Sequence, residues 1–327
     1  MLIEYKGRTV DTKHYSPLTD EQCNELREQY YQKPDMKEVV ENIRKVHKGG
    51  VVVSKITNYF FKDLMAKVKL HHSKWSIEEL FECNDLIRFV HGKTLDNRKV
   101  FPETNSDIKN IETALRLGGK GVASKPTNFP MKVADRILRD YNVNNVYYDF
   151  SCGWGVRLIS SLKHDIEYLG TDPNTLLVDR LNELGGLYNE VNNTNTKFTI
   201  KPQGSEIFVE EWENKVGLAF SSPPYFGLED YKVGEQSYKE GMNYSDWLEG
   251  YYKPTIQNIH KYLIQEGYLL ININNYDKYD LVGDTISLCE ECGFELIGKT
   301  ELQNLKRIKS TKELTEGKED IFIFKKE

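Results

Sequence analysis

Residues 146–162, which read VYYDFSCGWGVRLISSL, decide the fold of this chain. The aromatic and β-branched residues at 146–150 predict a buried strand, and the apolar spacing of residues 156–162 predicts a helix. Gly153 and Gly155 lie in the turn between them, where a missing Cβ lets the backbone approach a ligand closely. Strand, glycine turn and helix in this order are typical of a nucleotide-cofactor site in a doubly wound sheet.

A second predicted strand ends in an acid, at Tyr168 to Asp172, and Pro173 follows it. An acid at the tip of the second strand is placed to hold ribose hydroxyls. The third glycine of a dinucleotide fingerprint is missing, because Leu158 occupies that position. A Gly-x-Gly pair alone would also fit a dinucleotide enzyme, but the missing third glycine counts against one.

A proline arm follows another predicted buried strand at residues 216–220. Pro223 and Pro224 have no backbone N–H and cannot continue a central sheet, so the strand must end there. The Ser222 hydroxyl and the Pro223 carbonyl can accept hydrogen bonds from an exocyclic NH2, and Tyr225 can stack on a planar ring. The plainer alternative is a strand that ends in a proline turn.

This Ser-Pro-Pro-Tyr arm resembles the signature of the amino-methyltransferases of DNA. The spacing Asp149-x-x-x-Gly153-x-Gly155 is similar to the S-adenosylmethionine loop of class I methyltransferases. The resemblance covers about residues 120–327. It implies an α/β, Rossmann-like class I methyltransferase fold with a seven-stranded sheet, whose last two strands form a hairpin.

The resemblance also implies roles for individual residues. It assigns Asp149 to the methionine end of S-adenosylmethionine and Asp172 to the ribose. Phe129-Pro130 looks like the family's aromatic-proline pair next to the cofactor, although a proline at a helix start is also ordinary capping. The implied cofactor-binding residues are Phe129, Asp149, Ser151, Gly153, Gly155, Asp172 and Pro173, and the implied catalytic residues are Ser222, Pro223, Pro224 and Tyr225.

The implied activity is methyl transfer from S-adenosylmethionine to the exocyclic amine of a base flipped out of duplex DNA. Serine at position 222 favours cytosine N4, but the cofactor loop precedes the proline arm, unlike the commonest arrangement of that group. Adenine N6 therefore stays open. So do an RNA or protein amino-methyltransferase and a non-catalytic DNA-binding protein. A restriction endonuclease partner and the oligomeric state are left open.

Periodicity and turn residues predict the remaining elements. Expected helices span residues 18–31, 36–48, 77–89, 131–141, 175–188, 244–263 and 282–292, and expected strands span 197–203, 267–275, 294–302 and 320–325. Pro254 is expected to kink the helix at 244–263 or to begin its second half.

A glycine cluster at residues 118–121 predicts a boundary between a mainly helical region, 1–118, and a catalytic domain, 119–327. The catalytic domain has no obvious insertion that could read a DNA sequence, so residues 1–118 are the candidate target-recognition region. The predicted nucleic-acid contacts are Lys62, Lys67, Lys69, Lys306 and Arg307. The alternative is a solvated charged face above an aromatic core.

Composition indicates a globular protein of the cytoplasm. The chain has 327 residues, of which 39% are hydrophobic and 29% charged. It contains neither a long apolar stretch nor a secretory leader, and five cysteines without a leader suggest a reducing compartment. The net charge of −6 does not indicate nucleic-acid binding, although phosphate contact depends on a local basic face.

The cysteines do not predict a metal site or a nucleophile. Cys289-x-x-Cys292 lacks a second ligand pair, so packing is the favoured interpretation and no metal is expected. Cys152 is expected to fill space in the glycine turn, since no Pro-Cys dipeptide of a cytosine-C5 enzyme occurs.

Overall fold

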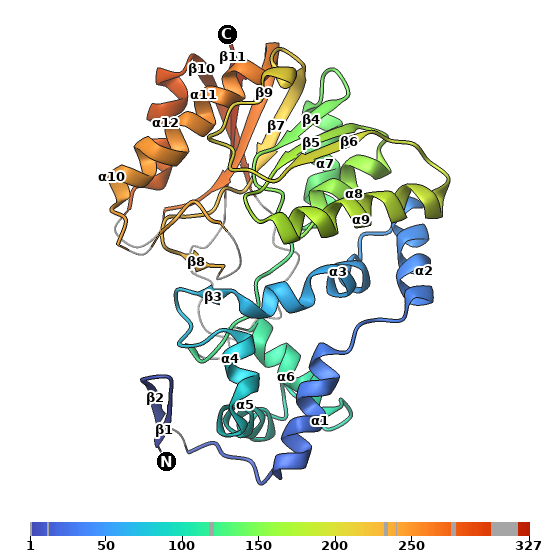
Figure 1. The fold of residues 1–327 in the computed structure, drawn as a ribbon, viewed down its shortest axis with the longest axis vertical. Helices are drawn as coiled ribbons and strands as arrows, with labels where there is room; N and C mark the ends of the chain where they lie inside the picture. Colours follow the sequence, from blue (N-terminus) through green and yellow to red (C-terminus); the bar gives the residue numbers. More distant parts are fainter. Residues whose placement is uncertain are drawn as a thin grey trace. The chain divides into compact units, whose positions relative to one another are not determined.

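A seven-stranded mixed sheet carries the predicted motifs. The computed structural model describes residues 2–11, 13–117, 121–231, 235–239, 241–275, 279–301 and 320–327. From edge to edge the strands are β10 (Phe294–Glu301), β11 (Asp320–Lys326), β9 (Leu263–Ile273), β7 (Val216–Ser221), β4 (Val146–Asp149), β5 (Glu167–Thr171) and β6 (Phe198–Lys201). Strands β6, β5, β4, β7 and β9 are parallel, whereas β11 is antiparallel to β9 and β10 (Figure 1).

The strand order reverses between β4 and β7. The chain adds β5 and β6 on one side of β4, and β7 and β9 on the other. Ligands bind beyond the carboxyl ends of the strands at such a reversal. This order, together with the antiparallel C-terminal hairpin, is that of the class I methyltransferase sheet, so the predicted fold class is confirmed.

Helices flank the parallel strands and explain their apolar sequences. All six residues of β7 are buried, as expected for a strand covered on both faces. Helices α7 (Met131–Tyr141), α8 (Val156–Lys163) and α9 (Thr175–Asn192) pack in a row. Helices α11 (Lys253–Tyr262) and α12 (Leu281–Glu291) pack together against β9 and β10 (Figure 1).

The helix predicted at residues 244–263 has three parts. Helix α10 (Tyr244–Trp247) continues as a π-helical turn, Leu248–Tyr252, and then as α11. Pro254 lies in the first turn of α11, directly after the π-helical turn. The expectation that Pro254 begins a second half is confirmed. A short 3₁₀ turn, η2 (Glu210–Trp212), precedes β7.

A second compact unit, here called the N-terminal unit, comprises residues 1–35, 61–127 and 227–233. It contains the hairpin β1 (Leu2–Tyr5) and β2 (Arg8–Asp11), the helices α1 (Asp20–Tyr31), α4 (Ile77–Glu82), α5 (Asn84–Asp96) and α6 (Asp107–Arg116), and the short pair β3 (Lys69–Leu70) and β8 (Glu229–Asp230). Phe61, Trp75 and Phe81 are buried in it, so the aromatic residues of this region form core. Helix α6 and the β1–β2 hairpin were not predicted.

The single helix predicted at 77–89 is wrong, because α4 and α5 are separate. Cys83 between them is extended, with φ −115° and ψ 110°. The Arg27 side chain stabilises the break, since it donates to the Phe81 carbonyl at 2.5 Å and to the Asn84 side chain at 2.9 Å. A long-range partner of this kind leaves no trace in local periodicity.

The predicted boundary at residues 118–119 differs from the observed division. Residues 36–60, 128–226 and 234–327 form the other compact unit, here called the sheet unit. Helix α2 (Met36–His47) packs on α9, and His47 Nδ1 lies 3.2 Å from the Tyr188 hydroxyl. The division falls within the unpredicted helix α3 (Ser54–Lys67), whose Phe60 carbonyl accepts a hydrogen bond from Arg180 at 2.8 Å.

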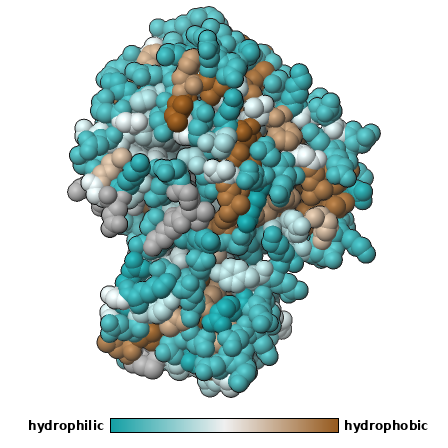
Figure 2. All heavy atoms as spheres, viewed as in Figure 1, coloured by the Kyte–Doolittle hydropathy of each residue, from teal (hydrophilic) through white to brown (hydrophobic). Residues whose placement is uncertain are grey.

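Polar residues dominate the molecular face drawn in Figure 2, with smaller apolar patches between them. Among the described helices, none has the length and apolar character needed to cross a membrane.

A buried carboxylate joins α7 to α8. Asp135 accepts hydrogen bonds from Ser160 Oγ at 2.7 Å, Lys163 Nζ at 2.7 Å and His164 Nε2 at 3.1 Å. Burial raises the pKa of Asp135, but these three hydrogen bonds outweigh burial and bring it to about 2. The ionised carboxylate therefore stabilises the folded state.

We expect Asp135→Asn to lower the free energy of unfolding by about 2 kcal/mol at pH 7, because a depression of about two pKa units has this value. A carboxyl group whose pKa is lower in the folded than in the unfolded chain stabilises the fold at pH values above its unfolded pKa, which is near 4. This contribution disappears as the pH falls towards the folded-state pKa of about 2. Urea unfolding should therefore give a difference between variant and wild type that shrinks from pH 5 to pH 3. A constant difference would contradict the assignment.

Candidate functional site

The candidate site lies at the carboxyl ends of β4 and β7, where the strand order reverses. Asp149 ends β4 and Ser221 ends β7. The glycine turn follows the first strand and the proline arm follows the second. The fold therefore brings together the two motifs that the sequence separates by about seventy residues.

The glycine turn needs its glycines for backbone reasons. Gly153 has φ +55° and Gly155 has φ +74°, a region that L side chains rarely adopt. Gly155 is also the N-cap residue of α8, and it caps the helix without a side chain. The turn therefore presents backbone at the start of a helix, as the cofactor assignment of these two glycines requires.

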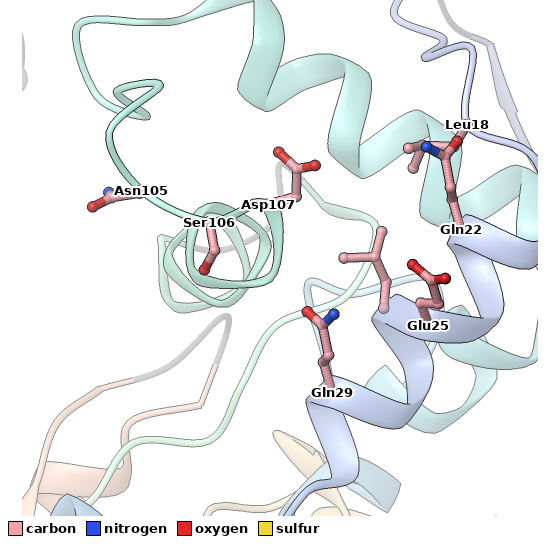
Figure 3. A pocket seen from close by; sticks show the side chains of 8 residues that line it. Leu18, Gln22, Glu25, Gln29, Asn105, Ser106 and Asp107 are labelled. Atoms are coloured by element: carbon pink, nitrogen blue, oxygen red, sulfur yellow. The ribbon is translucent and has the colours of Figure 1, made fainter.

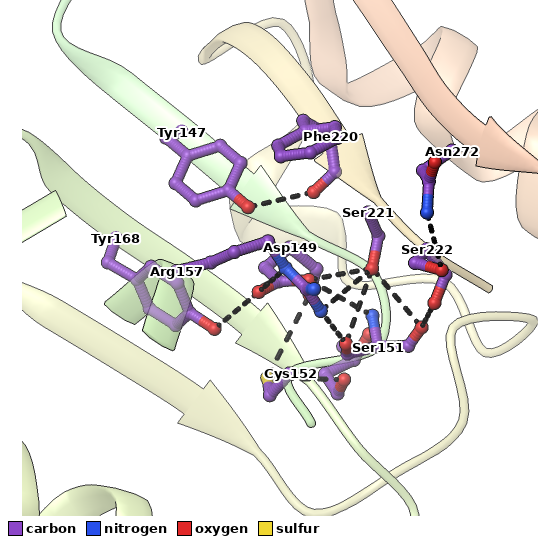
Figure 4. Close-up of polar contacts among 11 residues, drawn as sticks. Tyr147, Asp149, Ser151, Cys152, Arg157, Tyr168, Phe220, Ser221, Ser222 and Asn272 are labelled. Atoms are coloured by element: carbon purple, nitrogen blue, oxygen red, sulfur yellow. Dashed lines mark hydrogen bonds and ion pairs between the residues drawn. The ribbon is translucent and has the colours of Figure 1, made fainter. Parts of the chain in front are cut away.

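Asp149 is fully buried and its carboxylate is occupied by protein donors (Figure 4). Oδ2 accepts from Arg157 Nε at 2.8 Å and from the Tyr168 hydroxyl at 3.0 Å. Oδ1 accepts from Ser221 Oγ at 2.9 Å. The expected direct contact with the methionine end of a cofactor does not fit this geometry, because no carboxylate surface remains exposed.

Arg157 is the counter-ion of this carboxylate. Burial lowers the pKa of its guanidinium, but the Asp149 charge raises it further, so the group stays protonated. Its Nη2 also donates to the Ser151 carbonyl and, at 3.2 Å, to Ser221 Oγ. The sequence pattern does not reveal this role, because Arg157 is a single charged residue among the apolar residues at the start of α8.

Asp172 differs from Asp149 in being half-buried, at the tip of β5. Burial raises its pKa to about 7, although the backbone N–H groups of Asn174 and Gly153 act in the opposite direction. The Asn174 N–H donates to Asp172 Oδ1 at 3.1 Å. A carboxyl group with a shifted pKa beside the glycine turn is a typical feature of a functional site. Pro173, which follows Asp172, is half-buried.

The proline arm is held at three points. Ser222 Oγ accepts from Asn272 Nδ2 at 3.2 Å, and the Ser222 carbonyl accepts from Ser151 Oγ at 3.3 Å. The Tyr225 hydroxyl accepts from the Asn274 N–H at 2.7 Å. Sequence reasoning missed both contacts. The signal for Asn272 was a polar side chain at the end of an apolar strand, whereas the Asn274 contact uses the backbone N–H and has no side-chain signal.

Pro223 is buried, whereas Pro224 and Tyr225 are partly exposed. Phe226, which follows, is buried and lies edge-on to the rings of Tyr238 and Tyr279, both at 5.2 Å. Phe226 therefore anchors the arm in the core, and Tyr225 is the ring of the pair that can meet a ligand.

Phe129 lies beside the same strand ends. Its ring centroid is 5.4 Å from that of Phe220, at 71°, and 5.5 Å from Arg157 Cζ. This half-buried ring thus lies beside β7 and the start of α8, and its contact with a cofactor stays a prediction.

The cysteines behave as packing residues. Burial holds the pKa of the Cys152 thiol well above its usual range, and its Sγ donates to the Thr171 carbonyl at 3.3 Å. A Cβ on Gly170 would come within 2.6 Å of this sulfur, so the thiol fills its space completely. Cys289 is buried in α12, and no cluster of metal-ligating side chains occurs within the described ranges.

The predicted basic contacts need correction. Lys62 is buried, pairs with Glu112 at 2.6 Å and lies 4.2 Å from the centroid of the Tyr30 ring, so it is a core residue and unsuited to phosphate contact. Lys67 is 40% exposed but 4.0 Å from Glu78. Lys69 is half-buried in β3. Lys306 and Arg307 lie outside the described residues.

A groove occurs elsewhere, in the N-terminal unit. It is lined by Leu18 before α1, by Gln22, Glu25, Leu26 and Gln29 of α1, by Asn105 and Ser106 before α6, and by Asp107, the first residue of α6 (Figure 3). None of the predicted site residues lines it.

No family model and no curated protein matches the chain. In structure it is distantly similar to S-adenosylmethionine-dependent methyltransferases. One from Mesorhizobium loti is 14% identical, with a TM-score of 0.42, over 59% of this chain and 96% of that one. A TehB-like one from Corynebacterium glutamicum is 18% identical, with a TM-score of 0.39, over 59% and 86%.

A third is the 1,6-didemethyltoxoflavin-N1-methyltransferase of Burkholderia thailandensis, solved with S-adenosylhomocysteine. It is 11% identical, with a TM-score of 0.39, over 60% of this chain and 77% of that one. The fold class itself rests on the strand order and the terminal hairpin described above.

We expect Asp172→Asn to stabilise the ligand-free protein at pH 8, by about 1–3 kcal/mol. A raised folded-state pKa means that the folded chain holds a proton between about pH 4 and 7, so wild type loses stability as the pH rises through this window. The asparagine cannot ionise. Urea unfolding at pH 5 and pH 8 should show the gain mainly at pH 8, and an equal effect at both values would refute the raised pKa.

Proposed function

We propose that this chain transfers a methyl group from S-adenosylmethionine to the exocyclic amine of a DNA base, with cytosine N4 preferred. One observation carries the proposal. The Ser-Pro-Pro-Tyr arm leaves β7 beside the glycine turn, and the hydroxyl of Ser151 in that turn is 3.3 Å from the Ser222 carbonyl. An amine-binding arm and a cofactor loop in direct contact are what methyl transfer between two ligands requires.

The residues around the glycine turn fit the proposed cofactor. Gly153 and Gly155 keep the backbone free of Cβ atoms, and Asp172 offers a half-buried carboxylate that can accept hydrogen bonds from two ribose hydroxyls. Phe129 adds an apolar wall. Asp149 supports the turn from beneath. When bound, S-adenosylmethionine would supply an electrophilic methyl group to the amine nitrogen; S-adenosylhomocysteine would be the leaving group, and the proton displaced from the nitrogen would go to water.

The proline arm would prepare the amine for attack. The lone pair of an aromatic amine is delocalised into the ring, which makes the nitrogen a poor nucleophile. Hydrogen bonds from the NH2 group to Ser222 Oγ and the Pro223 carbonyl favour a localised lone pair. The Asn272 amide fixes the position of Ser222 Oγ, so this acceptor is oriented before the ligand arrives.

The planar ring of the target would stack on Tyr225. The base must leave the duplex to reach the arm, and stacking can return about 1–3 kcal/mol of the cost. The hydrogen bond between the Asn274 N–H and the Tyr225 hydroxyl holds the phenol ring in one orientation.

The choice of base and of polymer is the finer part of the proposal. Serine at 222 favours cytosine N4 by resemblance, whereas the order of the motifs keeps adenine N6 as the second candidate. RNA or a protein amide is the alternative substrate. Residues 1–118 are proposed to contact DNA, with Lys67 and Lys69 as the remaining basic candidates after the burial of Lys62.

The proposed cofactor should bind more tightly as the pH rises from 6 to 8. The ionised Asp172 carboxylate accepts from ribose hydroxyls, and its pKa of about 7 places the change in this window. Calorimetry with S-adenosylhomocysteine measures the affinity. Asp172→Ala should cost about 1–3 kcal/mol of binding at pH 8. Asp165→Asn, at the opposite end of β5, is the matched control, and absence of binding by folded wild type would exclude the cofactor.

The arm residues should act on transfer and leave cofactor affinity intact. Ser222→Ala removes one acceptor of the amine, so the rate should fall by about tenfold or more. Tyr225→Phe keeps the stacking ring and should lose less activity than Tyr225→Ala. Transfer of a labelled methyl group to duplex DNA, and calorimetry on each variant, measure the two effects. Equal rates for wild type and Tyr225→Ala would rule out stacking.

Nucleoside mass spectrometry of DNA from cells that express the chain identifies the base. We expect N4-methylcytosine. N6-methyladenine in its place would mean that adenine is the target base and would leave the proposed mechanism unchanged. Methylated nucleosides found only in RNA would mean that RNA is the substrate.

A further inference from the structure

A buried polar cluster lies beneath the candidate site, and the function proposed above gives no role to two of its members, Arg157 and Ser221. It consists of Asp149, Ser151, Arg157 and Ser221, and its members come from the end of β4, the glycine turn, the start of α8 and the end of β7 (Figure 4). Asp149 and Ser221 have no exposed surface, and Arg157 is 6% exposed. A buried ion pair contributes little to stability relative to apolar packing, which makes its presence here informative.

The hydrogen bonds of the cluster run from the ion pair to the arm. Ser221 Oγ has one proton, and the charged Asp149 Oδ1 at 2.9 Å is the strongest acceptor within its reach. Arg157 Nη2, at 3.2 Å, donates to one of its lone pairs. Ser221 can therefore sit in only one orientation.

Ser151 completes the connection. Its carbonyl accepts from Arg157 Nη2, and its hydroxyl lies 3.3 Å from the Ser222 carbonyl. That carbonyl belongs to the peptide bond that enters Pro223, a nitrogen without a proton, so the sheet ladder cannot hold the peptide plane from that side. The Ser151 hydroxyl supplies the hydrogen bond that does.

We infer that Asp149, Arg157 and Ser221 are positioning residues, which lock the glycine turn to the proline arm so that two ligands meet at a fixed distance. The inference rests on the proposed function for its effect on rate. The locking itself is a property of the chain without any ligand. Asp149 thus has a different role from the cofactor contact that the sequence suggested.

Trp154 offers a direct readout of the lock. It lies in the glycine turn and is half-buried, whereas the other three tryptophans, Trp75, Trp212 and Trp247, are at most 4% exposed. Quenching of tryptophan fluorescence by acrylamide therefore reports mainly on this turn. The Trp154→Phe variant verifies the assignment of the signal.

The first experiment compares Ser221→Ala with Ser160→Ala. Both hydroxyls are fully buried and each donates to a buried carboxylate, Ser160 to Asp135 at 2.7 Å. Both variants should lose similar stability. Only Ser221→Ala should increase quenching of Trp154 and lower the transfer rate about tenfold, with the dissociation constant for S-adenosylhomocysteine changed less than about threefold.

Several results would overturn the inference. Unchanged quenching and rate in Ser221→Ala would make the cluster ordinary core. Equal effects of Ser160→Ala would mean that general destabilisation moves the turn. A different result would separate the inference from the proposed function. If wild type transfers no methyl group to nucleic acid but Ser221→Ala still increases the quenching of Trp154, the proposed function fails and the positioning role remains.

A second experiment separates positioning from stability. Arg157→Met leaves the Asp149 charge buried without a counter-ion and should be strongly destabilised. Adding Asp149→Asn removes that charge, so the double variant should recover stability. It still lacks the donor to Ser151 and Ser221, so increased quenching of Trp154 and a low rate should persist. If the double variant recovers the stability, the low quenching of Trp154 and the transfer rate of wild type, the ion pair serves stability alone and does not position the arm.

Discussion

The ion pair between Asp149 and Arg157 is the constraint on which the site depends. A carboxylate at the carboxyl end of the central strand would be costly to bury alone, and the guanidinium at 2.8 Å removes that cost only in one geometry. That geometry fixes the turn between β4 and α8. The turn fixes Ser151, and Ser151 contacts the arm that leaves β7. The proposed cofactor and base sites are thus two faces of one rigid junction.

The two acids at the strand ends have different tasks. Asp149 is saturated by protein donors and serves the framework. Asp172 remains half-buried, and burial raises its pKa to about 7, so ionising it costs free energy that further hydrogen-bond donors would reduce. A group that destabilises the free protein and is held in place by the glycine turn is expected of a binding residue, because function is commonly obtained at a local cost in stability.

The sheet could be predicted from the sequence because its strands are apolar runs ended by glycine, proline or acid, and these signals are local. The two motifs could be recognised from their own residues, and their proximity follows once β4 and β7 are known to be parallel neighbours. The role of Asp149 could not be predicted, since it depends on Arg157, a charge placed in an apolar helix start. The helix break at Cys83 and the burial of Lys62 could not be predicted either. Each depends on a partner more than forty residues away in the sequence, Arg27 for the break and Glu112 for Lys62.

The interleaved division of the chain has a consequence for how it must be made. Residues 36–60 leave the ribosome early, yet helix α2 packs on α9, which is synthesised more than a hundred residues later. The N-terminal unit in turn waits for residues 227–233, whose strand β8 pairs with β3. The N-terminal unit lacks part of its structure until residue 233 has been made, and the sheet unit lacks part of its own until residue 327, so contacts of long sequence separation set the pace of folding. Cutting the chain at the glycine cluster near residue 118 would split both units, and neither fragment would carry a whole core.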